Sequence, residues 1–210
     1  MDALFDRLKH PNPNLRDRAM LELVETRDET TIPRLISILD EDDTTYRRAA
    51  VKTLGAIGMD TIPYLVDILA TSDNVTARGS AVKAIAQVIV NYPNEPLSSA
   101  GLECLKTSMS DDNPVVNIAA VMALGQLGTP AFELLAAALQ TTDNIALQVI
   151  LVNTLASIGD IRAEPILAAA IDDETLDEYV RESATSALPR LEQTIKYKEM
   201  NAARGNSSLA

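Results

Sequence analysis

The chain has few of the residues from which enzyme centres and bulky cores are usually built. Its 210 residues include no Trp, one Cys, one His, two Phe and five Tyr. One His and one Cys cannot together form a zinc site within a single chain, and one Cys excludes an internal disulfide. The core must therefore be built from Ala, Leu, Ile and Val, which favours packed helices over stacked sheets.

Basic residues are scarce as well, since 18 Lys and Arg stand against 30 Asp and Glu, for a formal net charge of -12. Such a charge repels phosphate backbones and anionic lipids, so we expect neither nucleic acid nor a membrane as a partner. No apolar run reaches membrane-spanning length, and acids occupy the place of a signal-peptide core. The lone Cys suits a reducing compartment, which predicts a cytoplasmic protein.

The chain does contain a repeated amphipathic phrase. Six residues align when the small and apolar positions of the repeated phrases are superposed. An apolar residue follows each of the six at the same distance. The aligned residues are Arg16, Arg47, Arg78, Asn117, Gln148 and Arg181, at successive spacings of 31, 31, 39, 31 and 33. A period near 31 residues is typical of a solenoid made from one repeated supersecondary unit.

The ends of the repeated helices can be read from the sequence. An N-cap residue stands four positions before the aligned one in Asn12, Asp43, Asn74, Asn113 and Asn144. A glycine that can end a helix in a left-handed conformation follows the apolar stripe at Gly58, Gly128 and Gly159. A proline such as Pro33 or Pro63 then opens a second apolar stretch. The predicted unit is therefore a helix, a short turn and a second helix.

The phrase YRRAAVKTLGAIG, followed by a helix that begins at a proline, resembles HEAT repeats, in particular the short type found in phycobilisome lyases. The resemblance covers residues 1–195 and implies an all-α fold, a right-handed α-α superhelix of about six repeats. Residues 196–210 lack an apolar period and are predicted to form a disordered polar tail. The whole chain also resembles small cyanobacterial HEAT proteins of the bilin-lyase-like kind, one group of which associates with A-type iron–sulfur carriers.

The aligned polar position predicts a structural ladder. It lies in the first turn of its helix, where the helix dipole disfavours a cation, so a nearby acid is expected to offset the charge. The predicted ladder comprises Asp42, Arg47, Asp73, Arg78, Asp112, Asn117, Asp143, Gln148 and Arg181. The alternative is that Arg47 and Arg78 hold an anionic ligand, such as the propionates of a bilin.

Partner-binding residues are predicted on the second helices, which line the concave side of HEAT arrays, and in an insertion. Eight residues beyond the usual period fall within residues 89–101, where prolines predict a protruding loop or an extended helix end. This insertion is either a functional loop or a tolerated surface addition. The predicted partner-binding residues are Arg34, Ser37, Tyr64, Asp67, Tyr92 and Glu133. For each of them the alternative is an ordinary solvated surface.

No residue is predicted to be catalytic or to bind a metal on its own. Cys104 lies on an apolar helical stripe and is interpreted as a core residue. The alternative is a thiolate that shares an iron–sulfur cluster with a partner or forms a transient adduct with phycocyanobilin. The segments GAIG and GQLG are interpreted as helix ends rather than phosphate-binding loops.

Two functions are compatible with these features. The favoured hypothesis is a non-catalytic scaffold whose concave face binds a phycobiliprotein or an A-type iron–sulfur carrier. The alternative is a bilin lyase, alone or with a second HEAT chain, that attaches a phycocyanobilin-type chromophore to a phycobiliprotein cysteine. Lyase chemistry of this kind mainly orients two reactants and needs no His cluster, so the missing triad does not exclude it. The scarcity of aromatic residues favours the scaffold.

Overall fold

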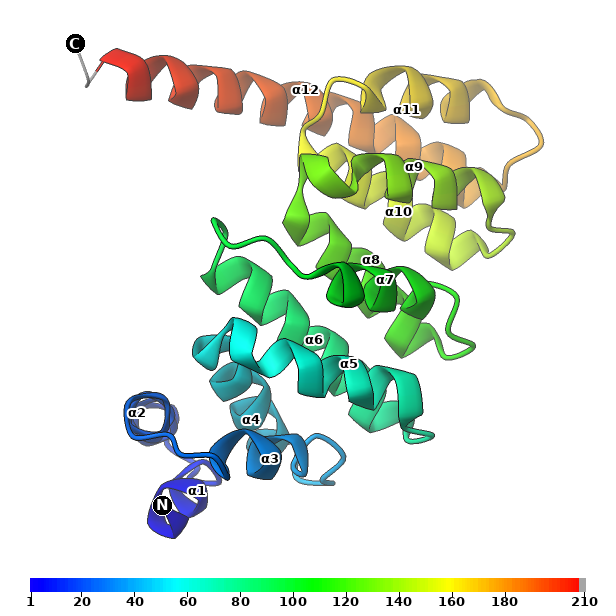
Figure 1. Cartoon of the computed structure of the whole chain (residues 1–210). Helices are drawn as coiled ribbons and strands as arrows, with labels where there is room; N and C mark the ends of the chain where they lie inside the picture. The colour runs from blue at the N-terminus through cyan, green and yellow to red at the C-terminus, as the bar shows by residue number, and fades with distance from the viewer. Residues whose placement is uncertain (208–210) are drawn as a thin grey trace. The chain divides into compact units, whose positions relative to one another are not determined.

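The computed structural model describes residues 1–207, with side chains described to residue 201, and all regular structure in that part of the chain is helical (Figure 1). The α-helices are α1 (Asp2–Arg7), α2 (Pro13–Glu25), α3 (Thr31–Ile36), α4 (Thr44–Ile57), α5 (Ile62–Thr71), α6 (Val75–Asn91), α7 (Ser99–Ser108), α8 (Pro114–Leu127), α9 (Phe132–Thr141), α10 (Ile145–Ile158), α11 (Ala163–Asp172) and α12 (Glu178–Ser207). Two 3-10 turns, η1 (Met59–Thr61) and η2 (Thr129–Ala131), precede α5 and α9. The all-α repeat prediction is confirmed.

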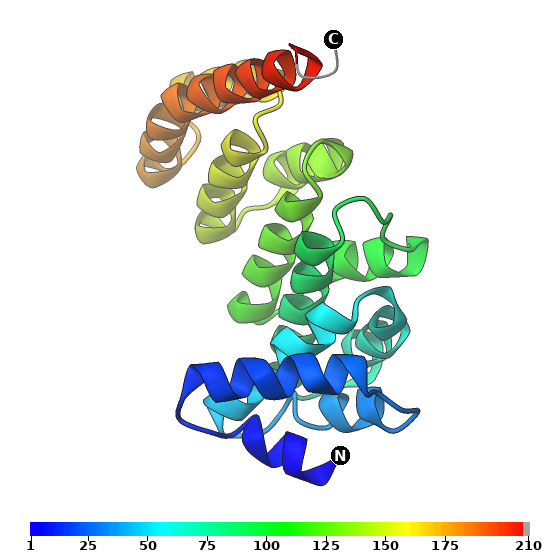
Figure 2. The same cartoon turned by 90° about the vertical axis from the view of Figure 1, so that its left-hand side faces the viewer.

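The chain divides into two compact units, Met1–Ala123 and the residues from Leu124 onward, with the boundary inside α8. In the first unit the first helices of successive repeats pack side by side, α2 on α4 and α4 on α6, and the second helices pack in the same way, α3 on α5 and α5 on α7. The short α1 lies against α2 (Figure 2). In the second unit α12 packs on α10 and α11. Each unit is thus a stack of helical pairs.

The predicted helix starts are confirmed, because each repeat uses its N-cap residue as expected. The capping oxygens accept backbone N–H groups at 2.9 Å for Asn12, 2.8 Å for Asp43, 2.8 Å for Asn74, 2.9 Å for Asn113 and 3.1 Å for Asn144. The predicted helix ends are confirmed too, since Gly58, Gly128 and Gly159 have φ angles of 92°, 69° and 64°. Local sequence therefore determines where these helices begin and end.

The two glycines within GAIG and GQLG have different tasks. Gly58 and Gly128 end their helices, whereas Gly55 and Gly125 lie inside α4 and α8. A Cβ atom on Gly55 would lie 2.3 Å from Cβ of Gln87 in α6, and one on Gly125 would lie 2.5 Å from Cγ2 of Thr154 in α10. The missing side chain therefore allows neighbouring first helices to approach closely.

The insertion at residues 89–101 extends α6 to Asn91 and then forms a loop that is fastened to the preceding repeat. The Tyr92 hydroxyl donates to the carbonyl of Ala56 at 2.6 Å, and the Asn91 side chain donates to the carbonyl of Gly55 at 3.0 Å. Both acceptors lie at the carboxyl end of α4, where helix carbonyls lack intrahelical partners. Tyr92, predicted to bind a partner, is thus engaged within the fold.

The prediction of a disordered tail from residue 196 is wrong for most of that segment. Helix α12 continues to Ser207, while residues 208–210 lie outside the described part of the chain. Lys, Glu, Met and Ala are strong helix formers, so the helix persists without an apolar stripe. Lys198 adds an anchor, because its ammonium group donates to the carbonyl of Ile158 at 2.5 Å.

Within residues 1–207, no single helix is both long and apolar enough to cross a membrane. Helices α4 and α5 meet the length and composition criteria only as a pair, and the chain bends by 117° between them.

Candidate functional site

The aligned polar residues close their own turns instead of forming the predicted Asp–Arg ladder. Five of the six, all but Arg181, donate to the backbone carbonyl six residues earlier. Arg16 bonds His10 at 2.6 Å, Arg78 bonds Ser72 at 3.1 Å, Asn117 bonds Asp111 at 3.1 Å and Gln148 bonds Thr142 at 2.9 Å, and Arg47 bonds Glu41 in the same way. These carbonyls would otherwise lack a protein partner, and a neutral amide satisfies them as well as a guanidinium does.

The acids at the predicted ladder positions do not pair with these residues. Among the described residues, no ion pair links Asp42 to Arg47 or Asp73 to Arg78, and Asp112 and Asp143 form no ion pair either. The turn carbonyl accepts a hydrogen bond from the cation and so helps to offset the unfavourable helix dipole, where a neighbouring carboxylate was expected to do so. The ladder prediction is therefore wrong in its partners, although the aligned residues are structural.

One buried ion pair does link successive repeats. Arg78 in α6 binds Asp111, in the turn before α8, in a bidentate manner with N–O distances of 2.8 and 3.1 Å. The two side chains are only 18% and 14% exposed. The hydrogen bonds from Arg78 lower the pKa of Asp111, and the same contact raises the pKa of Arg78. Arg47 and Arg78 thus both have hydrogen-bond partners within the chain, and the alternative that they hold the propionates of a bilin stays a hypothesis.

Two of the predicted partner-binding side chains hold helices together. Arg34 pairs with Asp2 at 2.8 Å and lies 4.0 Å above the ring of Phe5, which fixes α1 on α3. Glu133 pairs with Arg162 at 2.5 Å. Arg162 in turn holds Asp160 at 2.7 Å, and this contact lowers the pKa of the Asp160 carboxyl.

The remaining predicted partner-binding side chains lie on α3 and α5. The Ser37 hydroxyl donates to the carbonyl of Arg34 at 2.9 Å, so it closes its own helix. On α5, Tyr64 is 43% exposed and Asp67 is exposed. No side-chain hydrogen bond or ion pair of Tyr64 or Asp67 is present within the described residues. Of the predicted set, these two present their side chains most freely to a partner.

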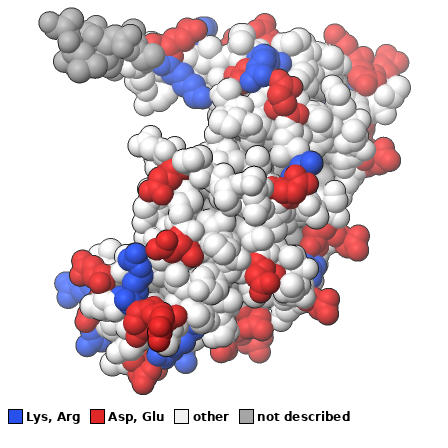
Figure 3. All heavy atoms as spheres, in the orientation of Figure 1, with Lys and Arg blue, Asp and Glu red and all other residues white. Residues whose placement is uncertain are grey.

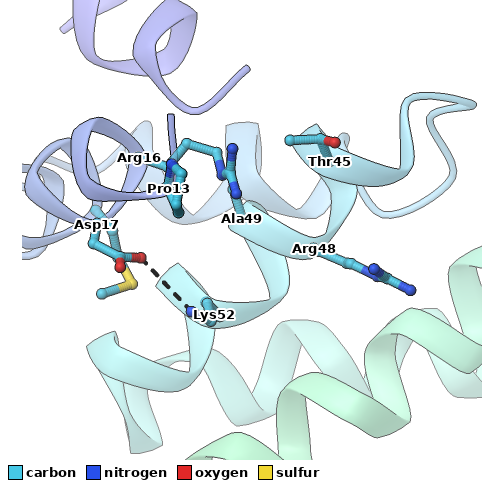
Figure 4. A pocket seen from close by; sticks show the side chains of 8 residues that line it. Pro13, Arg16, Asp17, Thr45, Arg48, Ala49 and Lys52 are labelled. Atoms are coloured by element: carbon cyan, nitrogen blue, oxygen red, sulfur yellow. Dashed lines mark ion pairs between the residues drawn. The ribbon is translucent and has the colours of Figure 1, made fainter. Parts of the chain in front are cut away.

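A small pocket of about 180 Å³ lies between α2 and α4 (Figure 4). Arg16, Arg48 and Lys52 supply positive charge, and Lys52 pairs with Asp17 at 3.6 Å. Arg16 is already bonded to its turn, and the Arg48 side chain points away from the Asp17–Lys52 pair (Figure 4). The lining of this pocket therefore carries a modest positive charge. The sequence did not predict a pocket between these two helices.

A larger groove of about 900 Å³ lies in the second unit. It runs along α9, the start of α10, α11 and the loop that precedes α12. Apolar residues such as Ile145, Ile166 and Leu176 line it together with the carboxylates of Asp143, Asp173 and Asp177. None of these residues stood among the predicted partner-binding residues. The only sequence signal was the 33-residue spacing between Gln148 and Arg181, where the other regular spacings are 31.

The loop before α12 also leaves the last aligned residue without its usual bond. The Nε atom of Arg181 is buried and has no hydrogen-bond partner among the described residues. Asp173 accepts from the backbone N–H and the hydroxyl of Thr175 at 2.9 and 2.6 Å, and these bonds lower the pKa of its carboxyl. The Asp173 carboxyl is thus held ionised beside the groove.

Cys104 in α7 is half-buried, and its Sγ lies 3.9 Å from the carbonyl oxygen of Val66. Burial raises the pKa of the thiol, which favours the neutral form over the thiolate at neutral pH. This environment agrees with a packing role. In the part of the chain that the structure describes, no three His, Cys, Asp or Glu side chains lie close enough together to hold a metal ion.

Charge is unevenly distributed along the chain. Nine of the 18 Lys and Arg residues lie within residues 1–52, so the rest of the chain is strongly acidic. In Figure 3, acidic side chains are scattered over the visible face, and basic ones gather mainly on the N-terminal helices. An acidic surface of this kind favours partners that present basic groups.

Comparison with known proteins gives close relatives of nearly the same length. A family profile for HEAT repeats matches residues 1–86 and 98–189, leaving out part of the insertion. The uncharacterized phycocyanin operon protein Z of Pseudanabaena tenuis is 54% identical over 198 residues, which cover 94% of this chain and 98% of that protein. The bilin biosynthesis protein CpeZ of Synechococcus sp. is 29% identical over 178 residues, which cover 82% of this chain and 95% of that protein.

Similar solved structures include a designed armadillo repeat protein, with a TM-score of 0.45 and 18% identity over 90% of this chain and 98% of that one. The complex of CpcE and CpcF of phycocyanin lyase from Nostoc sp. aligns with a TM-score of 0.35 and 16% identity, over 92% of both chains. The family profile spans most of the residues that form the helical pairs described above. The chain therefore belongs to the HEAT-repeat family, as a relative of phycocyanin operon protein Z and CpeZ.

Proposed function

We propose that this protein is a HEAT-repeat binding protein that holds a phycobiliprotein subunit. The observation that carries the proposal is the 54% identity with phycocyanin operon protein Z over nearly the full length of both chains. The name of that relative places it in a phycocyanin operon, and phycocyanin is a phycobiliprotein. A stack of helical pairs supplies an extended surface for such a partner.

The exposed face of α5 is the proposed contact surface in the first unit. Tyr64 offers a large side chain that is 43% exposed, and the carboxylate of Asp67 lies one helical turn further on. Tyr residues that become buried in an interface often contribute much of the binding free energy. Arg34, Ser37, Tyr92 and Glu133 are left out of this surface because their side chains bond within the fold.

The test is capture of purified phycobiliprotein subunits, with and without bilin, by the immobilised chain. We expect the double variant Tyr64→Ala with Asp67→Ala to weaken binding at least tenfold, in line with the loss of an interfacial aromatic residue. The matched control, Tyr197→Ala with Glu199→Ala, removes an exposed Tyr and an acid from α12. Equal binding by both variants would reject the α5 surface, and no capture of any phycobiliprotein would reject the proposed function.

The second candidate function is a bilin lyase or a lyase subunit, and the 29% identity with a bilin biosynthesis protein favours it. In that case the chain, alone or with a second HEAT chain, orients a phycocyanobilin-type chromophore beside a phycobiliprotein cysteine. The same binding assay, repeated with added phycocyanobilin, separates the two functions. A coloured adduct that survives denaturation on the phycobiliprotein, and forms only in the presence of this chain, identifies a lyase.

An A-type iron–sulfur carrier is the remaining proposed partner, with the cluster shared between the two proteins. The same capture assay with a purified carrier tests it. Transfer of cluster absorbance to the complex, lost in Cys104→Ser, would assign the thiol a ligand role. The raised pKa of Cys104 argues against that outcome, because a cluster ligand must be a thiolate.

A further inference from the structure

We propose that the groove along α9 and α11 binds a peptide segment of a partner protein in which Arg or Lys side chains alternate with apolar ones. The groove has a volume of about 900 Å³, which is enough for several side chains. The proposal goes beyond the proposed function, because it specifies the chemistry of a bound segment and holds for any partner that presents one.

The groove lies beside two second helices, α9 and α11, that the Glu133–Arg162 pair joins near their starts but that pack little on each other beyond it. In the first unit α5 contacts both α3 and α7, whereas α9 and α11 make no comparable contact. The loop from Asp173 to Asp177 also has five residues, where the connection between α9 and α10 has three. Thr175, Leu176 and Asp177 of this longer loop line the groove. This loop therefore forms one wall of the groove.

The apolar part of the groove is available for binding. Ile145 is 44% exposed, and Ile166 and Leu176 are half-buried. Beneath them, Leu139 and Ala170 are buried and belong to the core of the unit. Covering exposed aliphatic side chains with another aliphatic side chain removes apolar area from water, which is favourable at about 25 cal/mol per Å².

The charged part of the groove selects a cation. Asp143, Asp173 and Asp177 line it, and neither Lys nor Arg is among the lining residues. Arg181 is the nearby cation, and it helps to lower the pKa of Asp173. Further acids flank the loop at Asp172, Glu174 and Glu178, so the charge around the groove stays negative. Carboxylates pair well with guanidinium groups, which can form two parallel hydrogen bonds with them.

Binding of a short capped peptide that alternates Arg and Leu, labelled with a dye and followed by fluorescence anisotropy, tests the proposal on the full-length chain. We expect the double variant Asp173→Asn with Asp177→Asn to weaken binding about fivefold or more, and to reduce the sensitivity of binding to salt. Hydrogen exchange should slow on binding in residues 139–148 and 165–177. A peptide with Glu in place of Arg should not bind.

The matched control is Asp40→Asn with Asp42→Asn, which removes the same charge from an exposed turn of the first unit. It should bind the peptide within about twofold of the unaltered chain, because the groove is intact. Equal loss in both double variants would overturn the proposal, since it would show attraction to the acidic chain as a whole. Absence of binding at about 1 mM peptide in low salt would also overturn it. If the groove variant still captures phycobiliproteins, binding of a phycobiliprotein does not depend on the groove, and the two proposals can fail separately.

Discussion

At the residue scale, the contact between Arg78 and Asp111 is the interaction with the clearest energetic consequence. Both side chains are largely buried, so breaking the pair leaves a guanidinium without its acceptor. The sequence predicted the neighbouring residue, Asp112, as part of the ladder. The repeat period does not show which side chains of successive repeats come close enough to form a hydrogen bond. The two partners are 33 residues apart, and only packing of α6 beside the turn before α8 brings them together.

Replacing Asp111 with Asn should lower the free energy of unfolding at pH 7 by about 2 kcal/mol, since a charge-assisted bidentate contact is lost. The hydrogen bonds from Arg78 hold the folded-state pKa of Asp111 below the ordinary value for an aspartate. Its contribution is therefore complete above that value and is lost as pH falls through the lower folded-state pKa. Urea unfolding at pH 7 and at about pH 3 should show the difference between the two proteins shrinking on acidification.

Asp112→Asn is the control for that measurement, because Asp112 is exposed and forms no ion pair among the described residues. It should change the free energy of unfolding by less than about 0.5 kcal/mol at either pH. Equal effects of the two substitutions would show that the local charge, and not the contact with Arg78, stabilises the protein.

Two helical glycines of the first unit should respond in opposite ways to the same substitution. Gly55→Ala places a methyl group 2.3 Å from Cβ of Gln87, so α4 and α6 must separate, at a cost of about 1–3 kcal/mol. Gly79→Ala meets only a Val115 methyl group at 3.4 Å, and it should stabilise α6 by about 0.5–1 kcal/mol. Thermal unfolding followed by circular dichroism distinguishes the signs, and a lower melting temperature for both variants would contradict the packing argument.

At the scale of the element, the insertion between α6 and α7 depends on Tyr92. Tyr92→Phe removes the hydrogen bond to Ala56 and keeps the ring, so we expect a loss of about 1 kcal/mol. The effect should be local, with faster hydrogen exchange and faster proteolysis in residues 92–98. Tyr197→Phe, which alters a Tyr that is 67% exposed, should leave both rates unchanged.

Elements whose signals are local were predictable from the sequence, and those that depend on distant contacts were not. The N-cap of α4 and the glycine that ends it were predicted, because one residue and its immediate neighbours decide them. The hydrogen bond from Tyr92 to Ala56 was not predicted, because its acceptor lies 36 residues earlier in the chain. The only sequence feature associated with the groove beside α11 is a repeat spacing that is two residues longer than the regular one. This spacing does not show that a groove is present.

At the scale of the whole molecule, the repeat period predicted the helical pairs but not the division of the chain at α8. The spacing from Asn117 to Gln148 is the regular 31, so nothing in the sequence marks a boundary there. The sequence showed the net charge of -12, from which we expect that phosphate backbones are not partners. Only the folded chain shows which acids line the groove along α9 and α11.

The aligned polar position recurs along the whole chain. Arg47→Gln should preserve the bond to the turn carbonyl, as Gln148 does in its own repeat, and change the free energy of unfolding by less than about 1 kcal/mol. Arg47→Ala removes the donor and should cost more, because the carbonyl then depends on water. Urea unfolding of both variants checks this, and equal losses would show that the charge itself matters.

The interchange of Arg, Asn and Gln at this position has a consequence for how such arrays diversify. Because an uncharged amide and a guanidinium close the same turn, each repeat can gain or lose a positive charge without altering its backbone. Electrostatic character can thus drift independently of architecture. Related chains that share this scaffold could therefore recruit differently charged partners through substitutions that leave their helices in place.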